Sequence, residues 1–120
     1  MTDAEIDALE GRALDSAVAR IVLEHCVVRS VSGDTYTESD AAGMPFHPLR
    51  AYHADWAAMG LVVAEMKRRG WWITIHSWLP DEAEAIMWPL AKDPRRVHER
   101  AATEPVALAR AALKAVREGA

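Results

Sequence analysis

The chain has a single cysteine and no long hydrophobic run. Cys26 cannot form an internal disulfide, so the sequence favours a reducing compartment, and we expect a buried thiol in a cytoplasmic protein. No apolar run approaches the roughly 20 residues that a helix needs to cross a bilayer. Residues 1–10 are acidic and amphipathic, unlike a signal peptide. The sequence therefore predicts neither secretion nor membrane insertion.

Basic charge and familiar catalytic motifs are also scarce. The formal net charge is −4, the wrong sign for the basic surface that general nucleic-acid binding requires. The sequence contains no glycine-rich phosphate loop, no HExxH pattern and no paired cysteines at metal-ligand spacing. We therefore expect no general nucleic-acid binding, no cofactor and no resident metal.

What the sequence does contain fits one folded domain over residues 1–120. Hydrophobic residues make up 51% and charged residues 27%, which is ordinary for a folded protein. A chain of 120 residues is long enough to bury a core without disulfides or metals. Five tryptophans are many for this length, and such residues are enriched at interfaces. On that ground we expect a homo-oligomer.

The stretch from Tyr52 to Leu79 organises the chain. Its first half predicts a helix, because Asp55 suits the helix start and Gly70 suits its end. The apolar stripe that faces the core falls at helical spacing: Trp56, Met59, Gly60, Val63 and Met66. A glycine inside a helix costs about 1 kcal/mol relative to alanine, and close packing by a neighbour is the usual reason for keeping it.

After Gly70 the periodicity changes to that of a strand, over residues 71–79. One face carries Trp71, Ile73 and Ile75, and the other carries a second set: Trp72, Thr74, His76 and Trp78. A second strand over residues 86–90 is expected to run antiparallel to it through an exposed turn at residues 80–84. Pro89 cannot donate a hydrogen bond to a sheet, so this strand should lie at an edge or end there.

The flanking segments predict further helices and strands. A capping box of Thr2 and Glu5 starts a helix over residues 3–25, in which Gly11 is the weak point. Thr103 caps a closing helix whose first turn contains Pro105. Short strands are expected at residues 26–32 and 35–37, and a loop or short strand at 92–100. The predicted fold is α+β, a small and mostly antiparallel sheet sandwiched by helices.

Three segments of this chain resemble one family. They are the helix entry at Tyr52, His53, Asp55 and Ala58, the opening helix at residues 6–12, and the alanine-rich ending at residues 102–115. These segments are similar to the phage α-β-α sandwich domain, a group of small bacteriophage proteins. The resemblance implies a helix–sheet–helix sandwich from a phage or prophage, with no established activity and no catalytic residues. His53 replaces the usual serine at the helix entry.

Three groups of residues are candidates for a site. The face with Trp72, Thr74, His76 and Trp78 offers two indoles, a hydroxyl and an imidazole, which suit a flat ligand such as a nucleobase. In a sandwich with both sheet faces covered, the same residues would be core. A metal site near His53 and Asp55, with His47 six residues upstream, is the second candidate.

The third candidate is a basic group that would bind phosphate if the loop after Leu90 folds back toward the helix end. Its members are Lys67, Arg68, Arg69, Arg95, Arg96 and Arg100. Helix-dipole compensation and a solvated loop explain the same charges. Of this group, Arg69 is the residue that we include among the candidate ligand contacts.

Two functions remain open from the sequence. The first is a phage accessory protein that acts by binding a host protein or a small nucleotide-like ligand, without chemistry. Its candidate contacts are Trp72, Thr74, His76, Trp78, His53, Asp55 and Arg69. The alternative is a small metal-dependent or His/Asp-dependent hydrolase that uses His53, Asp55 and His76.

Overall fold

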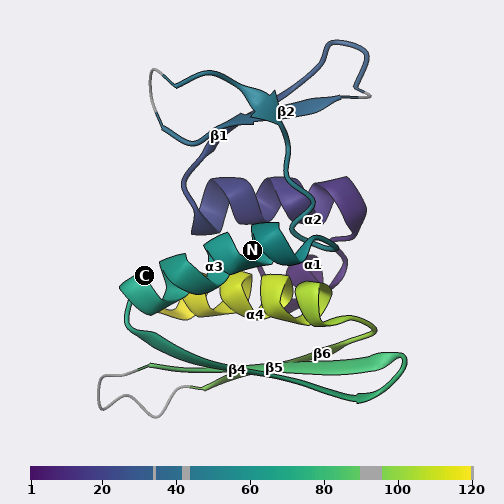
Figure 1. The fold of residues 1–120 in the computed structure, drawn as a ribbon, viewed down its shortest axis with the longest axis vertical. Coiled ribbons are helices and arrows are strands. Elements are labelled where there is room, and N and C mark those ends of the chain that lie inside the picture. The colour runs from purple at the N-terminus through teal and green to yellow at the C-terminus, as the bar shows by residue number, and fades with distance from the viewer. Residues whose placement is uncertain (34, 42–43, 90–95, 120) are drawn as a thin grey trace.

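The computed structural model describes residues 1–33, 35–41, 44–89 and 96–119; the side chains of Trp78, Glu118 and Gly119 are not described. Figure 1 shows four layers, with helices in the middle and a small sheet on either side. The helices are α1 (Asp3–Asp7), α2 (Gly11–Ala17), the π-helix η1 (Val18–Val22), α3 (Trp56–Arg68) and α4 (Glu104–Gly119). The strands are β1 (Cys26–Arg29), β2 (Tyr36–Ser39), β3 (His47–Pro48), β4 (Trp71–Leu79), β5 (Glu82–Pro89) and β6 (Val97–Ala101).

The expected α+β class and the antiparallel pairing are confirmed. The strands divide between two three-stranded sheets, in the orders β1-β2-β3 and β4-β5-β6, and every pair is antiparallel. The sheet β4-β5-β6 packs on α4 and α3, whereas β1 lies against η1 (Figure 1). Each sheet therefore has one face toward the helices.

The long opening helix divides into three pieces. The capping box forms as expected: Glu5 N donates to Thr2 Oγ1 at 3.1 Å, and Thr2 N donates to Glu5 Oε1 at 3.0 Å. The single helix over residues 3–25 is wrong, because Gly11 takes a left-handed φ of +52° and Glu10 is extended. That backbone ends the first helix and turns the chain before α2, which only glycine accommodates easily.

Helix α3 begins and ends where the sequence predicts. Asp55 Oδ1 accepts a hydrogen bond from Ala57 N at 3.0 Å, and Gly70 has a φ of +92°. Its stripe is rotated from the expected one, because Ala58 and Val62 join Met59 and Met66 in the core. Trp56 is consequently 61% exposed. A Cβ at Gly60 would meet no atom of the described residues within 4 Å, so the expected close packing there is wrong.

The hairpin of β4 and β5 carries the larger sheet. Strand β4 spans residues 71–79 as predicted, and β5 ends at Pro89, opposite Trp71. Residues 82–84, which we expected in the turn, belong to β5. The connection between β4 and β5 is shorter than predicted and consists of residues 80–81. The inner face of this sheet buries Ala85, Met87 and Val97 against the helices.

The closing helix α4 is the centre of the core. It starts at Glu104 behind Thr103, whose carbonyl accepts from Ala107 N at 3.1 Å. Small side chains let α1, α3, η1 and the larger sheet approach it closely, and most are fully buried: Ala107, Ala109, Ala111, Ala112 and Ala115. Cys26, by contrast, is exposed on β1, because that strand lies at the edge of its sheet. The expected buried thiol is wrong.

Candidate functional site

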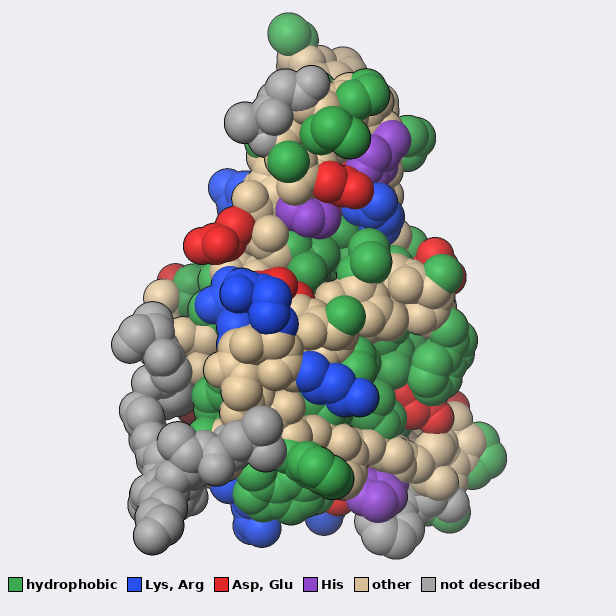
Figure 2. All heavy atoms as spheres, turned by 60° about the vertical axis from the view of Figure 1, so that its left-hand side comes forward, with side chains coloured by type: hydrophobic (Ala, Val, Ile, Leu, Met, Phe, Trp, Pro, Cys, Tyr) green, Lys and Arg blue, Asp and Glu red, His purple; other side chains and the backbone are tan. Residues whose placement is uncertain are grey.

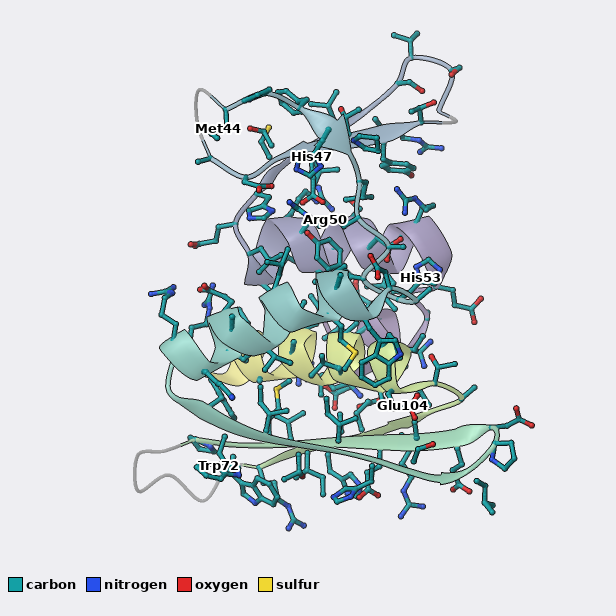
Figure 3. All side chains as sticks on the ribbon, viewed as in Figure 1. Met44, His47, Arg50, His53, Trp72 and Glu104 are labelled. Carbon is teal, nitrogen blue, oxygen red and sulfur yellow. The ribbon has the colours of Figure 1, made fainter. Side chains whose placement is uncertain are left out.

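The outer face of β4-β5-β6 points away from the helices. Trp72 lies on it, and Figure 3 shows this residue on the far side of the sheet from α3 and α4. Among the described residues, no helix or strand covers this face. Figure 2 shows hydrophobic side chains gathered at the base of the molecule, where this sheet lies. The sequence is compatible with a buried or an exposed outer face. Trp72 is 61% exposed, so the face is open to solvent at this residue.

An aromatic pair dominates one end of the outer face. Trp72 and Trp88 are cross-strand partners in β4 and β5, which places their Cβ atoms about 5 Å apart. Trp88 and its strand neighbour Ile86 are half-buried. Tryptophan is among the residues that contribute most to binding when it is covered by a partner. The pair therefore offers a broad apolar contact.

A charged group occupies the other end. Glu84 is only 6% exposed, and its Oε2 lies 2.7 Å from His98 Nε2 and 3.3 Å from Arg100 Nε. The hydrogen bond from His98 lowers the pKa of Glu84 below its ordinary value, and Arg100 adds to the effect. Because this carboxylate is engaged by two exposed basic side chains, this end of the outer face presents basic groups to solvent.

The remaining members of the predicted face are less informative. The Thr74 hydroxyl is buried and has no hydrogen-bond partner in the part of the chain that the structure describes. A ligand would therefore have to displace neighbouring side chains to reach it. His76 is exposed and lies opposite Glu84. Trp78 belongs to β4, but its side chain lies outside the described part of the structure.

A shallow pocket opens where α3 meets β4. Its volume is about 370 Å³, and it is lined by Lys67, Trp71, Trp72 and Ile73. This size falls at the lower end of the range for small-molecule sites. A cation beside an indole suits a planar anionic ligand, which the indole would stack on and the ammonium would neutralise.

The other predicted contacts lie elsewhere. His53 binds the buried Asp15: its backbone N and its Nδ1 are 2.9 Å and 2.8 Å from Asp15 Oδ1. Asp55 caps α3, and Arg69 lies at the opposite end of this helix, about 20 Å away, where it donates to Val22 O at 2.8 Å. Figure 3 places His53 and Trp72 on different sides of the molecule. The predicted set is therefore not one site.

The basic group does not converge either. Arg68 and Arg69 both form ion pairs with Glu65 in α3. These pairs favour a local structural role for the two arginines over a phosphate site. Arg95 lies outside the described residues. Arg100 engages Glu84 on the neighbouring strand of the sheet β4-β5-β6. The described members give no shared phosphate site.

A polar cluster that the sequence analysis does not predict lies between the smaller sheet and the helices. We use "polar cluster" for six residues: His25, Glu38, Asp40, His47, Arg50 and Tyr52. Glu38 is fully buried at its centre and accepts hydrogen bonds from His25 Nδ1, Arg50 N and Tyr52 Oη. Burial raises the pKa of Glu38, but these hydrogen bonds outweigh it and lower the pKa overall.

The edge of the polar cluster is more exposed. Arg50 donates from Nη1 and Nη2 to the two oxygens of Asp40 at 2.8 Å and 3.1 Å. Arg50 and then His47 hold the pKa of Asp40 well below its ordinary value. Of the metal candidates considered from sequence, His47 belongs here, whereas His53 and Asp55 do not. Only the strand alternation that puts Glu38 and Asp40 on one face could have suggested the cluster.

Comparisons with protein-family models and with curated proteins find no match to this chain. The phage resemblance thus stays a prediction. Within the described residues, no helix is both long and apolar enough to cross a membrane.

Proposed function

We propose that this is a binding protein that holds a host protein on the outer face of β4-β5-β6, as an accessory protein of phage or prophage origin in the bacterial cytoplasm. The observation that carries the proposal is the exposure of Trp72, at 61%, on a sheet face that no described element covers. Covering a large, solvent-exposed apolar side chain with a partner lowers the free energy, which favours binding.

The shape and charge of this face favour a protein as the partner. Small molecules bind in concave sites that enclose most of their surface, whereas Trp72, Trp88 and Ile86 follow the surface of a sheet. Indoles and arginines are the side chains enriched at protein interfaces, and Arg100 lies on the same face, opposite Glu84 at the other end from the indoles. The exposed basic groups suit an acidic surface on the partner, because complementary charge speeds and orients association.

The hydrolase alternative gains no support from the geometry. His53 is bound to Asp15, and the Asp55 side chain caps α3. His76 projects from the outer face of β4, on the side opposite to the helices that hold His53. A general acid or base must lie within hydrogen-bond reach of the group it serves, so these three residues do not form one reaction centre.

A comparison of two tryptophan variants tests the proposal. Trp72→Glu places a charge on the outer face, and Trp56→Glu is the matched control, because Trp56 is equally exposed but lies on α3. Proteins retained from a host lysate by wild type, Trp72→Glu and Trp56→Glu should be quantified side by side, and the strongest difference reconstituted from purified proteins. We expect a partner retained by wild type and Trp56→Glu and lost by Trp72→Glu. Equal retention by both variants would overturn the proposal.

A small nucleotide-like ligand is the second candidate, which the pocket beside Lys67 and Trp72 favours. Binding to the folded state raises the melting temperature by mass action, so a thermal-shift panel of mono-, di- and cyclic nucleotides tests it. A shift that Lys67→Ala and Trp72→Ala both abolish would support a nucleotide. No shift across the panel would reject this candidate.

Self-association is a separate outcome. A second copy on the outer face would double the mass, which light scattering measures directly. A homo-oligomer lost in Trp72→Glu and kept in Trp56→Glu would identify the face as an interface between copies. A monomer of 13.3 kDa at high concentration would exclude that and leave the face to a different protein.

A further inference from the structure

We infer that the polar cluster is a binding site for a divalent transition-metal ion of the zinc class, with His25, Glu38, Asp40 and His47 as ligands. Two imidazoles and two carboxylates form a donor set that Zn²⁺ accepts. The site is independent of the proposed function, because it lies between β2, β3 and the helix layer, at the opposite end of the molecule from Trp72 (Figure 3).

Three of the four donors already lie close to the arrangement that such an ion needs: His25, Glu38 and Asp40 each offer a ligand atom within 4.8 Å of the others. Zinc bonds of about 2.0–2.1 Å place tetrahedral ligand atoms about 3.3 Å apart. His25 Nδ1 is 2.8 Å from Glu38 Oε2 and 3.7 Å from Asp40 Oδ1, and His47 Nε2 is 2.8 Å from Asp40 Oδ1. Shifts of about half an ångström would bring these three distances to that spacing. His47 contacts only Asp40 in this set, so its side chain would have to turn toward the ion to complete the site.

The hydrogen bond at the other ring nitrogen of His47 is the independent support. His47 Nδ1 lies 2.9 Å from the carbonyl oxygen of Pro48, which can only accept, so Nδ1 carries the proton. In the neutral ring, Nε2 then directs a lone pair at Asp40 Oδ1, which is also an acceptor. A cation satisfies both atoms, as a second ring proton or as a metal ion. A ligating histidine is typically held by a backbone carbonyl in this way.

Residues around the ligands fix the orientation of the carboxylates. Tyr52 Oη donates to Glu38, at 2.9 Å from Oε2, and Arg50 N donates to Glu38 Oε1 at 2.9 Å. Such outer contacts orient metal ligands and contribute to metal affinity. A metal on Asp40 Oδ1 would displace the hydrogen bond from Arg50 Nη1, at 2.8 Å, and leave Oδ2 with Arg50 Nη2, at 3.1 Å. The two carboxylates offset the charge of the ion, and the half-exposed side chain of Asp40 provides the entrance.

Metal titration of the stripped protein tests the inference. The purified chain, dialysed against a chelator, should bind one equivalent of Zn²⁺ by calorimetry, and Co²⁺ should give the strong visible absorption of a tetrahedral site. Zinc should also raise the melting temperature. We expect His25→Ala, His47→Ala and Asp40→Asn each to weaken Zn²⁺ binding at least tenfold. The matched control is His98→Ala, whose imidazole also pairs with a glutamate but on the other sheet, and it should bind as wild type does.

Two results would overturn the inference. One is a wild-type protein that takes up no Zn²⁺ and shows no thermal shift. The other is Zn²⁺ binding by His25→Ala and His47→Ala that equals that of wild type and His98→Ala, which would assign the ion to another place. Circular dichroism checks that each variant is folded. If a variant unfolds, the inference is judged by whether the wild-type protein binds Zn²⁺.

Discussion

Trp72 and Trp88 stand directly opposite each other on β4 and β5, on the face of the sheet turned away from the helices. Their neighbours on the other face, Trp71 and Met87, are buried under those helices. The same hairpin therefore presents one aromatic side to the core and one to solvent. Our proposal that the outer face binds a partner rests on this division.

Replacing Glu84 by glutamine should flatten the acid side of the stability profile. The pKa of Glu84 is lowered from 4.5 by His98 and Arg100. A carboxyl group with a lowered pKa in the folded state stabilises the protein above its ordinary pKa, and this stabilisation is lost as the pH falls through the folded-state value. We expect wild type, but not Glu84→Gln, to lose this contribution below about pH 4.5. Urea unfolding across a pH series measures it, and parallel profiles would contradict it.

Thr74→Val should stabilise the protein by about 1 kcal/mol. The Thr74 hydroxyl is buried without a hydrogen-bond partner among the described residues, and valine has the same shape without that unsatisfied group. Because the hydroxyl is not accessible, binding of a partner to the outer face should not change. Urea denaturation checks the first expectation. A loss of stability would show that the hydroxyl has a partner, such as a bound water.

Tyr52→Phe should destabilise the fold by about 2 kcal/mol. The Tyr52 hydroxyl is buried and donates to Glu38, and hydrogen bonds to charged groups contribute more than neutral ones. Tyr36→Phe is the control, because Tyr36 is only partly buried, beneath the guanidinium of Arg29. We expect that control to change the free energy of unfolding by less than about 0.5 kcal/mol. Equal effects of the two variants would remove the special role of Glu38.

Gly60→Ala should raise the free energy of unfolding by up to about 1 kcal/mol. Gly60 is exposed inside α3 with helical backbone, and a methyl group there meets no atom within 4 Å. Gly70→Ala is the contrasting variant, because its φ of +92° strains any other residue, and it should destabilise the protein. Thermal unfolding of the pair measures both signs. A destabilising Gly60→Ala would indicate a packing role for this glycine.

The sequence predicts local structure well where backbone signals are strong. Asp55 and Gly70 mark the ends of α3, and the alternation after Gly70 gives β4 its residues and its two faces. Gly11 is a weak point of the predicted opening helix, but the local pattern does not predict its left-handed φ of +52°. Tertiary packing also rotates α3 enough to expose Trp56.

The site was harder to predict for the same reason. Strand periodicity correctly put Trp72 and Ile73 on opposite faces, but it could not say which face the helices cover. The polar cluster joins residues from Glu38 to Tyr52 with His25, and only the folded smaller sheet brings them together. Because Glu38 and its partners His25 and Tyr52 are far apart in the sequence, their hydrogen bonds could not be predicted from local pattern.

The most direct test of the account is the affinity of the purified partner for the two tryptophan variants, measured by calorimetry. Truncation of a central interface residue typically costs 2–4 kcal/mol, so we predict that Trp72→Glu binds at least about 30-fold more weakly than wild type. Trp56→Glu should bind within about twofold of wild type, because surface changes away from an interface have small effects. Equal affinities for Trp72→Glu and Trp56→Glu would contradict the claim that the outer face of β4-β5-β6 is the binding surface.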